Sequence, residues 1–416
     1  MKILTIVYSI GPGGTERAAV NYAIAYKRAG CDSRVWVLGE GHDRKDRLDE
    51  EQVMTYLDKR DNQHLQHAIE IENWKPDIIH IHTFDSRLSS LIGPLKKNGA
   101  KLVETNVFSR PRFSIESKQV DISFQLAYWG VWKYGKWMRN ENGRPINLRL
   151  PYLIFEEDFG CVIENSRDQL CTQLGIPANA FIAARVGQSH LSKWDRKIFT
   201  IAKKVINLDR NIFFLFVGLP EALKEELATL PQNIRANIKS LDLIIGDEEL
   251  TKFYTAIDVF VHISAIGESF GYVLAEAMIC GCPVITLCTP LKDNAQFEVV
   301  GNNVGGYCVK DVDEFAERLL DMSKGRFDFN KAILRQHVVS RFSEKAVVTS
   351  LLDTYALLKN GASDILRKSE AKEFQIARDV VKEQLNKFGF RSLFIKASLA
   401  IIHLPVFYKL KTRANR

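Results

Sequence analysis

The sequence predicts an α/β protein with two Rossmann-like domains and a helical carboxyl-terminal extension. Three observations predict it: apolar strands alternate with helical patterns, two such series each open with a strand followed by glycine, and a basic segment follows the second series. Strands rich in Val, Ile and Phe that alternate with helices are typical of parallel βαβ units. A length of 416 residues fits two domains. We expect the domains to face each other across a cleft, with functional loops at the carboxyl ends of their strands.

The first domain is expected over residues 1–158. Its elements are strands over Ile3–Tyr8, Arg34–Leu38, the segment KPDIIHIH from Lys75 and Lys101–Thr105, with a helix over about Thr15–Arg28. The loop GPGG, which contains Gly13 and Gly14, precedes that helix, and helix amino termini attract anions. A dinucleotide fingerprint is disfavoured because its third glycine position is Glu16. An anion site and a tight turn without ligand both remain open.

The second domain is expected over residues 159–342, after an inter-domain crossing near Leu150. Its strands are Phe181–Val186, Ile212–Val217, Asp258–Ser264 and Pro283–Leu287. A helix over 343–360 is expected to return to the first domain, and residues 361–416 form the extension.

The segment from Val259 to Thr286 carries the strongest chemical signal. It reads as a strand, a polar loop with Glu268, a helix from about Phe270 and a stop at Gly281. Glu276 lies about two turns into that helix. Two carboxylates suit hydroxyl groups and a helix amino terminus suits a phosphate, a combination that favours a sugar linked to a nucleotide. The alternative is a solvated Glu268 and a surface Glu276.

The segment ESFGYVLAE followed by AMICGCPVIT resembles the signature of the retaining GT-B glycosyltransferases of family four. The resemblance extends over roughly residues 1–358 and includes GPGGTER, KPDIIHIHT, ARVGQSHLSKW, FFLFVG, DEELTKFYTAIDVFVHIS and RFSEKAVVTSLLDTYALL. It implies a GT-B fold and transfer, with retention, from a nucleoside-diphosphate sugar to a hydroxyl of a glycan or lipid-linked acceptor. The setting it implies is bacterial surface polysaccharide assembly, such as lipopolysaccharide. No cofactor and no metal are expected.

The resemblance also implies roles for individual residues. The residues expected to be catalytic are Glu268, Lys193 and Asn106. Glu268 is expected to act at the donor sugar and Lys193 at the diphosphate, whereas Glu276 would hold the ribose. The remaining donor-binding positions are Gly13, Gly14, Gln188, Gly218, Phe270 and Gly271.

Two positions depart from the family pattern. Gln188 stands where an arginine is usual, so Lys193 acts alone or Arg185 or Arg196 compensates. Asn106 stands where a histidine is common, and an amide can hydrogen-bond a sugar but cannot take a proton at neutral pH. These departures keep two other function classes open: an epimerase or hydrolase on the same fold, and a non-catalytic sugar-nucleotide-binding subunit.

Three weaker motifs are interpreted as structural. The histidines of His80-Ile-His82 share one strand face, and a structural or substrate-contact role is favoured over a metal site. Asp311-Val-Asp313 is interpreted as a helix cap. Cys280 and Cys282 are interpreted as buried packing residues. The stretch from Tyr128 to Arg139 holds three tryptophans among cations, and a membrane or sugar-stacking surface and an ordinary packed helix remain open.

The extension carries the whole net charge of +7, because residues 361–416 contain twelve Lys or Arg and five Asp or Glu. A basic body of the kind that binds nucleic acid is therefore not expected. We expect a charged helix over Ser363–Phe388 and, after Gly389, an apolar helix over Arg391–Leu404 with one polar stripe of Ser392, Lys396 and His403. With the cations of the chain end (Lys409, Lys411, Arg413 and Arg416), this favours an anionic membrane surface, the alternative being packing on protein.

The location that the sequence favours is the cytoplasm. Seven cysteines without a CxxC pair indicate buried free thiols in a reducing compartment, and we find neither a signal peptide nor a spanning segment. Together with the extension, this predicts a peripheral enzyme on the inner face of the cell membrane.

Overall fold

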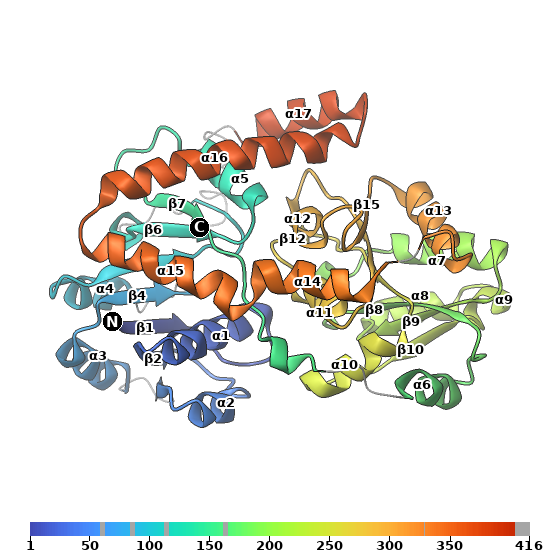
Figure 1. The fold of residues 1–416 in the computed structure, drawn as a ribbon, viewed down its shortest axis with the longest axis horizontal. Coiled ribbons are helices and arrows are strands. Elements are labelled where there is room, and N and C mark those ends of the chain that lie inside the picture. Colours follow the sequence, from blue (N-terminus) through green and yellow to red (C-terminus); the bar gives the residue numbers. More distant parts are fainter. Residues whose placement is uncertain (59–62, 84–87, 112–115, 161–164, 328, 404–416) are drawn as a thin grey trace. The chain divides into compact units, whose positions relative to one another are not determined.

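The computed structural model describes all residues except 59–62, 84–87, 112–115, 161–164, 328 and 404–416. The chain forms two compact units (Figure 1). Unit 1 comprises Met1–Ile154, Phe342–Leu385 and the chain from Arg391 onward, and unit 2 comprises Phe155–Arg341 and the short piece Asn386–Phe390.

Unit 1 is built on a seven-stranded parallel sheet with the order β3-β2-β1-β4-β5-β6-β7. The strands are β1 (Lys2–Val7), β2 (Asp32–Val37), β3 (Met54–Leu57), β4 (Ile78–Ile81), β5 (Lys101–Thr105), β6 (Ile122–Gln125) and β7 (Ile146–Arg149). Central strands such as β4 are buried at every residue, which is why they read as continuous apolar runs. β7 is an edge strand, so one row of its backbone groups needs partners outside the sheet.

The helices of unit 1 connect these strands in sequence. They are α1 (Gly14–Arg28), α2 (Lys45–Glu50), α3 (Gln63–Trp74), α4 (Leu88–Lys96) and α5 (Tyr128–Met138). α1 is nearly all buried over its middle, and its small residues let it lie close to β1 and β2. The strand–loop–helix order therefore places the GPGG loop at the carboxyl end of β1, as expected.

Unit 2 contains a six-stranded parallel sheet with the order β10-β9-β8-β11-β13-β15. The strands are β8 (Phe181–Val186), β9 (Ile212–Val217), β10 (Ile238–Leu241), β11 (Val259–His262), β13 (Val284–Leu287) and β15 (Gly306–Val309), and a separate two-stranded pair joins β12 (Gly267–Glu268) to β14 (Asp293–Asn294). The sheet and its covering helices share one large apolar core that includes Phe214, Phe216 and Leu319.

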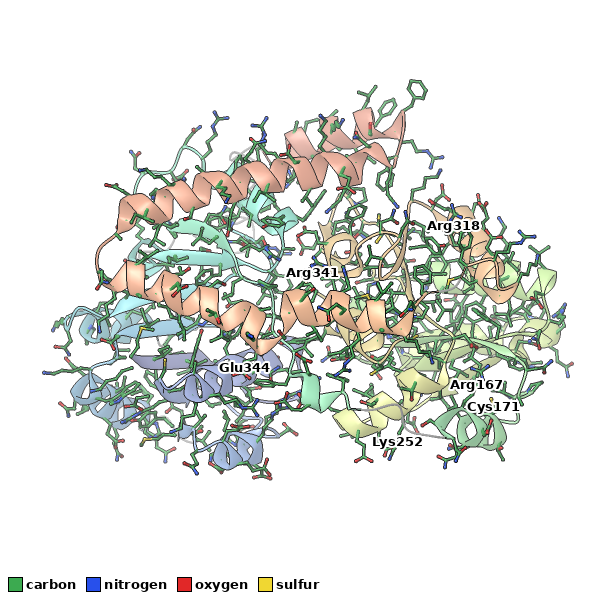
Figure 2. The ribbon with its side chains drawn as sticks, in the orientation of Figure 1. Arg167, Cys171, Lys252, Arg318, Arg341 and Glu344 are labelled. Carbon is green, nitrogen blue, oxygen red and sulfur yellow. The ribbon has the colours of Figure 1, made fainter. Side chains whose placement is uncertain are left out.

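The helices of unit 2 are α6 (Ser166–Leu174), α7 (Lys197–Leu208), α8 (Glu221–Ala228), α9 (Gln232–Arg235), α10 (Asp247–Ala256), α11 (Tyr272–Ile279), α12 (Gln296–Val300), α13 (Val312–Ser323) and α14 (Lys331–Phe342). Arg167 on α6, labelled in Figure 2, donates to the carbonyl oxygens of Ala180 and Ala256 and pairs with Asp258. The Arg167 guanidinium thus connects α6 to the residues that directly precede β8 and β11.

Three helices complete unit 1: α15 (Glu344–Lys359), α16 (Ser363–Asn386) and α17 (Arg391–Ile402). The Ser343 side chain caps α15 by accepting a hydrogen bond from the backbone amide of Ala346. An isolated parallel β-bridge joins Ser343 to Ile154, the last residue of the first segment of unit 1. α16 runs past β7 and α5, and α17 follows it (Figure 1). Leu385 on α16 and Leu399 on α17 share an apolar cluster with Trp129 on α5, so the extension packs on unit 1.

The helix expected from about Phe270 instead begins at Tyr272, because Gly271 has a φ of +86° that no helix can include. The described cysteines are free and buried, as expected, and Cys161 lies outside the described residues. Five strands of the two large sheets went unpredicted. They are β3, β6, β7, β10 and β15, and several of these carry polar residues; the two-residue β12 and β14 also went unpredicted.

Candidate functional site

Glu268 is held at the carboxyl side of the unit 2 sheet by an unusual piece of backbone. It forms β12 with Gly267, whose φ is +78° and whose missing Cβ would lie 2.0 Å from the carbonyl oxygen of Asp293. Only glycine fits this approach. The pairing of β12 with β14 therefore fixes the Glu268 backbone, and its side chain is only 10% exposed. The solvated alternative for Glu268 is thereby excluded.

Two groups flank the Glu268 carboxylate. Nε2 of His262, the last residue of β11, lies 3.3 Å from Oε1, and Nζ of Lys193 lies 3.9 Å from Oε2. Burial raises the pKa of Glu268, but the hydrogen bond from His262 and the charge of Lys193 outweigh burial and lower it overall. Burial also lowers the pKa of His262 to about 4. At neutral pH the pair is thus a carboxylate beside an uncharged imidazole.

Arg185, at the end of β8, is a second cation of this cluster. Its side chain is 2% exposed, its Cζ lies 4.9 Å from the Trp194 ring centroid, and Nη2 donates to the carbonyl oxygen of Lys193. Nε and Nη1 are buried without a protein partner among the described residues. Burial lowers the pKa of Arg185 to about 10, while Glu268 and Tyr254 raise it. Arg185 therefore stays charged at neutral pH with two donors unused.

Glu276 lies on α11 and is 3% exposed. Its Oε2 accepts a hydrogen bond from the Tyr254 hydroxyl at 3.2 Å. Burial, and next the charge of Glu276, raise the pKa of Tyr254 well above its usual value, so this phenol is a donor over the whole physiological range. Glu276 is therefore a buried, oriented carboxylate, which excludes the surface alternative.

Gly271 and Phe270 stand between the two carboxylates in sequence. Gly271 is the N-cap of α11, and a Cβ there would lie 2.9 Å from Leu274 and 3.5 Å from Glu268. Phe270 is 1% exposed and packs edge-on against Tyr272. The backbone amides at the start of α11 carry the partial positive charge of a helix terminus next to Glu268.

Gly187 and Gly218 follow β8 and β9 and touch each other. A Cβ on Gly218, whose φ is +76°, would lie 2.1 Å from the carbonyl oxygen of Gly187. Gln188 comes next and is exposed, and its carbonyl oxygen accepts from Nε1 of Trp194 at 3.1 Å. This bond closes the loop that carries Lys193. Gly187 and Gly218, which pack together at the start of that loop, therefore help to position Lys193. Arg196 is exposed and pairs with Glu226, away from this cluster.

In unit 1, Gly13 is the N-cap of α1 and Gly14 its first residue. The carbonyl oxygen of Gly13 accepts from the amide of Arg17, and a Cβ on Gly13 would meet the Glu16 carboxylate at 2.0 Å. Asn106 is 1% exposed, and its amide bonds the backbone of Arg110 on both sides, as donor at 2.9 Å and as acceptor at 3.1 Å. In this structure the Asn106 amide organises the 106–110 loop.

His80 lies on β4 and His82 directly follows it, with ring centroids 4.3 Å apart. His80 is bonded to Tyr26 and Thr105, which supports a structural role. His82 is 3% exposed with both ring nitrogens unbonded among the described residues, and burial lowers its pKa to about 3. This uncharged imidazole at the carboxyl end of β4 is a candidate for contact with a substrate.

The remaining weak motifs have structural roles. Asp311 accepts the amide of Glu314 at 3.0 Å and caps α13, as expected. Burial raises the pKa of Cys280 to about 12, so it is a neutral packing thiol. Trp129 and Trp137 on α5 are buried, which fits the packed-helix alternative. Among the described residues no group of three or more His, Cys, Asp or Glu is arranged to hold a metal ion.

The sequence had pointed to Glu268, Lys193 and Glu276 but not to His262 or Tyr254. His262 ends the strand that leads into the motif, so its place before a polar loop was a usable signal. Tyr254 lies on α10, and nothing local to its sequence indicates a contact with a residue 22 positions away.

Part of the chain matches a known protein family. Residues 189–324 match the model of the family described as glycosyl transferases group 1. No curated protein matches the sequence.

Solved structures share the fold. They include Anabaena HepE in complex with UDP-glucose (TM-score 0.65, 16% identity, 86% of this chain and 99% of that chain), a glycosyltransferase from Rickettsia africae (0.67, 17%, 86% and 98%) and the lipopolysaccharide outer core galactosyltransferase WaaB (0.60, 14%, 86% and 100%). These similarities establish the expected α/β fold with two Rossmann-like domains. The chain thus has the GT-B fold, and its residues 189–324 match the group 1 glycosyltransferase family.

Proposed function

We propose that this protein transfers a sugar, with retention, from a nucleoside-diphosphate sugar to a hydroxyl of a glycan or lipid-linked glycan. The observation that carries the proposal is the buried cluster around Glu268, in which two cations and one neutral histidine surround a fixed carboxylate. Such a cluster is costly unless charged or polar ligand groups complete it. The match of residues 189–324 to the group 1 family supports the same reaction class.

We assign a different part of the donor to each residue according to its chemistry. Glu276, oriented by Tyr254, is suited to hold ribose hydroxyls, and Glu268 with the amides at the start of α11 is suited to hold the sugar. As the bond between the anomeric carbon and the diphosphate breaks and the bond to the acceptor oxygen forms, negative charge develops on the diphosphate. Lys193 and Arg185 stabilise that charge, and the acceptor proton leaves with the phosphate or to solvent.

Arg185 is proposed to supply the positive charge that is missing at Gln188, where the family pattern has an arginine. The exposed Gln188 carries no charge, but Arg185 offers two unused buried donors beside the Lys193 loop. We therefore propose that Arg185 takes over the charge-neutralising role. We further propose that His82 contacts the acceptor and that the GPGG loop, with Gly13 and Gly14, contacts the donor phosphate.

The proposed reaction needs no metal, because two cations and a helix terminus can together neutralise the leaving diphosphate. Turnover measured with EDTA is expected to equal turnover without it. A strict requirement for added Mn²⁺ or Mg²⁺ would contradict this part of the proposal.

A bacterial surface glycan is the proposed acceptor class. WaaB is a lipopolysaccharide galactosyltransferase, and a further neighbour, Staphylococcus aureus TarM, binds UDP with a glycosylated glycerol (10% identity, TM-score 0.60). UDP-sugars are the first donors to test, since HepE binds UDP-glucose. Sugar released or epimerised without acceptor would favour an epimerase or hydrolase, and donor binding without turnover on any acceptor would favour a non-catalytic subunit.

We also propose that α17 attaches the protein to the inner face of the cell membrane. The polar residues Ser392 of α17 and His403 just after it are buried, whereas Leu393 and Phe394 are 65% and 78% exposed. An outward apolar face next to Arg391 and Lys396 suits a layer of acyl chains and anionic headgroups. Lys396, expected in the polar stripe, is instead exposed. The cations from Lys409 onward lie outside the described residues, within which no helix is long and apolar enough to cross a membrane.

The test of the reaction is transfer from labelled UDP-sugars to extracted bacterial glycolipids, followed by analysis of the anomeric configuration of the product. Product with the donor configuration is the expected result. An inverted product would contradict retention.

A further inference from the structure

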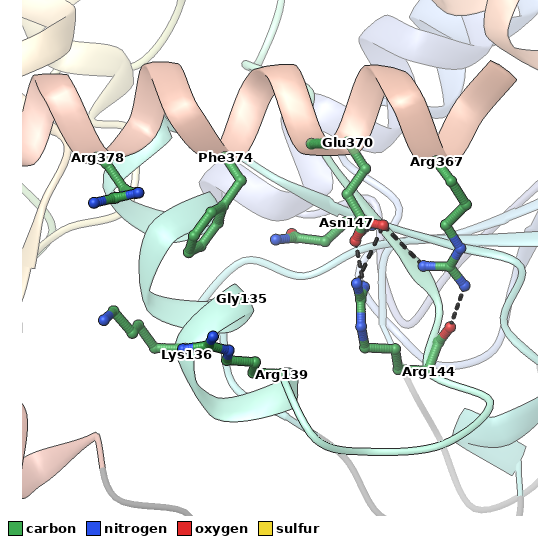
Figure 3. A pocket seen from close by; sticks show the side chains of 10 residues that line it. Gly135, Lys136, Arg139, Arg144, Asn147, Arg367, Glu370, Phe374 and Arg378 are labelled. Carbon is green, nitrogen blue, oxygen red and sulfur yellow. Dashed lines mark hydrogen bonds and ion pairs between the residues drawn. The ribbon is translucent and has the colours of Figure 1, made fainter. Parts of the chain in front are cut away.

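A cationic cavity of about 730 Å³ lies between α5 and α16 within unit 1 (Figure 3). This volume is within the usual range for a small-molecule site. The charged side chains that line it are five cations and one carboxylate: Lys136, Arg139, Arg144, Arg367, Arg378 and Glu370. The cavity is therefore strongly positive, although residues 1–360 as a whole are neutral.

The one carboxylate in the cavity is already saturated. Glu370, which is 6% exposed, pairs with Arg144, accepts from Arg367 at 2.9 Å, and accepts the backbone amide of Asn147 at 3.0 Å. Figure 3 shows this network on one side of Phe374 and Arg378 on the other. Glu370 thus has no capacity left to neutralise further cations.

Three cations are consequently left over. Lys136 on α5 and Arg139 just after it have no ion pair with any described residue. Arg378 on α16 has only a 3.4 Å contact with the amide oxygen of Gln375. Three positive charges gathered at one cavity repel one another, and an anion with several oxygens would remove that repulsion.

Hydrogen bonds and packing hold in place the helices that form the cavity walls. Glu370 and Glu373 of α16 accept the amides of Asn147 and Arg149 on the edge strand β7. The Phe374 ring packs where Gly135 has no side chain, and a Cβ there would lie 2.5 Å from the ring. Only a glycine at position 135 of α5 leaves room for the Phe374 ring. The backbone positions from which the exposed Lys136, Arg139 and Arg378 extend are therefore fixed before a ligand binds.

We propose that this cavity binds a phosphate or diphosphate group. Guanidinium forks match phosphate oxygens in geometry, and a phosphate carries more charge and more acceptor oxygens than one carboxylate. The group could belong to a soluble phosphorylated molecule or to a lipid headgroup. The site lies wholly in unit 1 and is independent of the cluster around Glu268 in unit 2, so it stands whether or not the proposed transfer is correct.

The test compares four full-length proteins by calorimetry with inorganic diphosphate at low salt. These are the wild type, Lys193→Ala, which weakens the diphosphate site proposed in unit 2, and two variants made in the Lys193→Ala background. Those two are the triple variant Lys136→Ala/Arg139→Ala/Arg378→Ala and the control Lys372→Ala/Lys382→Ala on exposed positions of α16. We expect diphosphate to bind the triple variant at least about tenfold more weakly than the control and Lys193→Ala. Unchanged melting temperatures check that each variant folds.

Vesicles then identify the source of the phosphate. Binding is compared between phosphatidylcholine vesicles and vesicles that also contain phosphatidylglycerol, so that the charge-dependent part is separated from insertion of α17. Loss of both diphosphate and phosphatidylglycerol dependence in the triple variant supports a lipid headgroup. Loss of diphosphate binding alone supports a soluble phosphate. A triple variant that matches the control with both probes overturns the proposal.

Discussion

Nε2 of His262 lies 3.3 Å from Oε1 of Glu268, and Nδ1 of the same ring lies 3.0 Å from the Thr286 hydroxyl. Burial keeps the imidazole uncharged, since its pKa is about 4. A neutral ring carries one N–H, so it donates to Glu268 through Nε2 and accepts from Thr286 through Nδ1. The tautomer of His262 thereby orients the carboxylate at the centre of the candidate site.

Replacement of His262 tests this orienting role. His262→Phe keeps an aromatic ring but removes the donor, so Glu268 loses its hydrogen bond and we expect turnover to fall at least about tenfold. Thr286→Val removes only the hydroxyl that bonds Nδ1 of His262, so it should lower turnover less than His262→Phe does. Steady-state kinetics and melting curves of both variants provide the measurement, and equal turnover in His262→Phe and the wild type would refute the role.

Arg185 is expected to supply the charge that Gln188 lacks. Arg185→Met removes two buried donors and a positive charge, so UDP affinity should fall about tenfold, whereas Arg185→Lys should retain part of it. Arg196→Met is the matched control, because Arg196 is exposed and paired with Glu226. Calorimetry with UDP decides the question. If the control loses as much affinity as Arg185→Met, Arg196 rather than Arg185 compensates.

The outward face of α17 is expected to carry membrane attachment. Leu393→Asp/Phe394→Asp places two charges on exposed apolar positions, so flotation with phosphatidylglycerol-containing vesicles should weaken at least about tenfold while the melting temperature stays unchanged. Ile365→Asp changes a comparably exposed residue of α16, 51% exposed, and should float normally. Undiminished flotation of the double variant would rule out this surface.

Glu373 makes the docking of α16 dependent on pH. Burial, partly offset by the Arg149 amide, raises its pKa to about 7, from a usual value near 4.5. Between these values the folded state binds more protons than the unfolded state, so the free energy of unfolding falls as pH rises from about 4.5 to 7. We expect Glu373→Gln to flatten this dependence and Glu383→Gln, an exposed control on α16, to leave it unchanged. Thermal melting of all three proteins across that range gives the answer. Parallel curves would contradict the assignment.

The sequence predicted the fold where local patterns carry it. Apolar runs marked β1, β8 and β9, and glycine with proline marked the end of α11 correctly. The four-residue β6 and β7 went unpredicted because Gln125 and Asn147 interrupt their apolar character, although both residues are buried. Their polar groups find partners only in the folded chain.

The site shows the same division. Glu268 and Glu276 follow from a linear motif, whereas the pairing of Tyr254 with Glu276 depends on how α10 and α11 pack. The cationic cavity joins α5 to a helix more than 200 residues later, so Arg139 and Arg378 could not be linked by spacing alone. The polar stripe of Ser392, Lys396 and His403 was recognised from periodicity, but only packing reveals that Ser392 and His403 are buried whereas Lys396 is exposed.

The most direct test of the central claim is calorimetric titration of UDP-sugars into the wild type, Lys193→Ala and Glu276→Gln. Gln replaces Glu276 because it keeps an acceptor for Tyr254 and so protects the fold. We expect the wild type to bind a UDP-sugar and both variants to bind it at least about tenfold more weakly, with Glu248→Gln, an exposed control on α10, unchanged. Equal affinity in all four proteins would contradict a nucleotide-sugar site at Lys193 and Glu276.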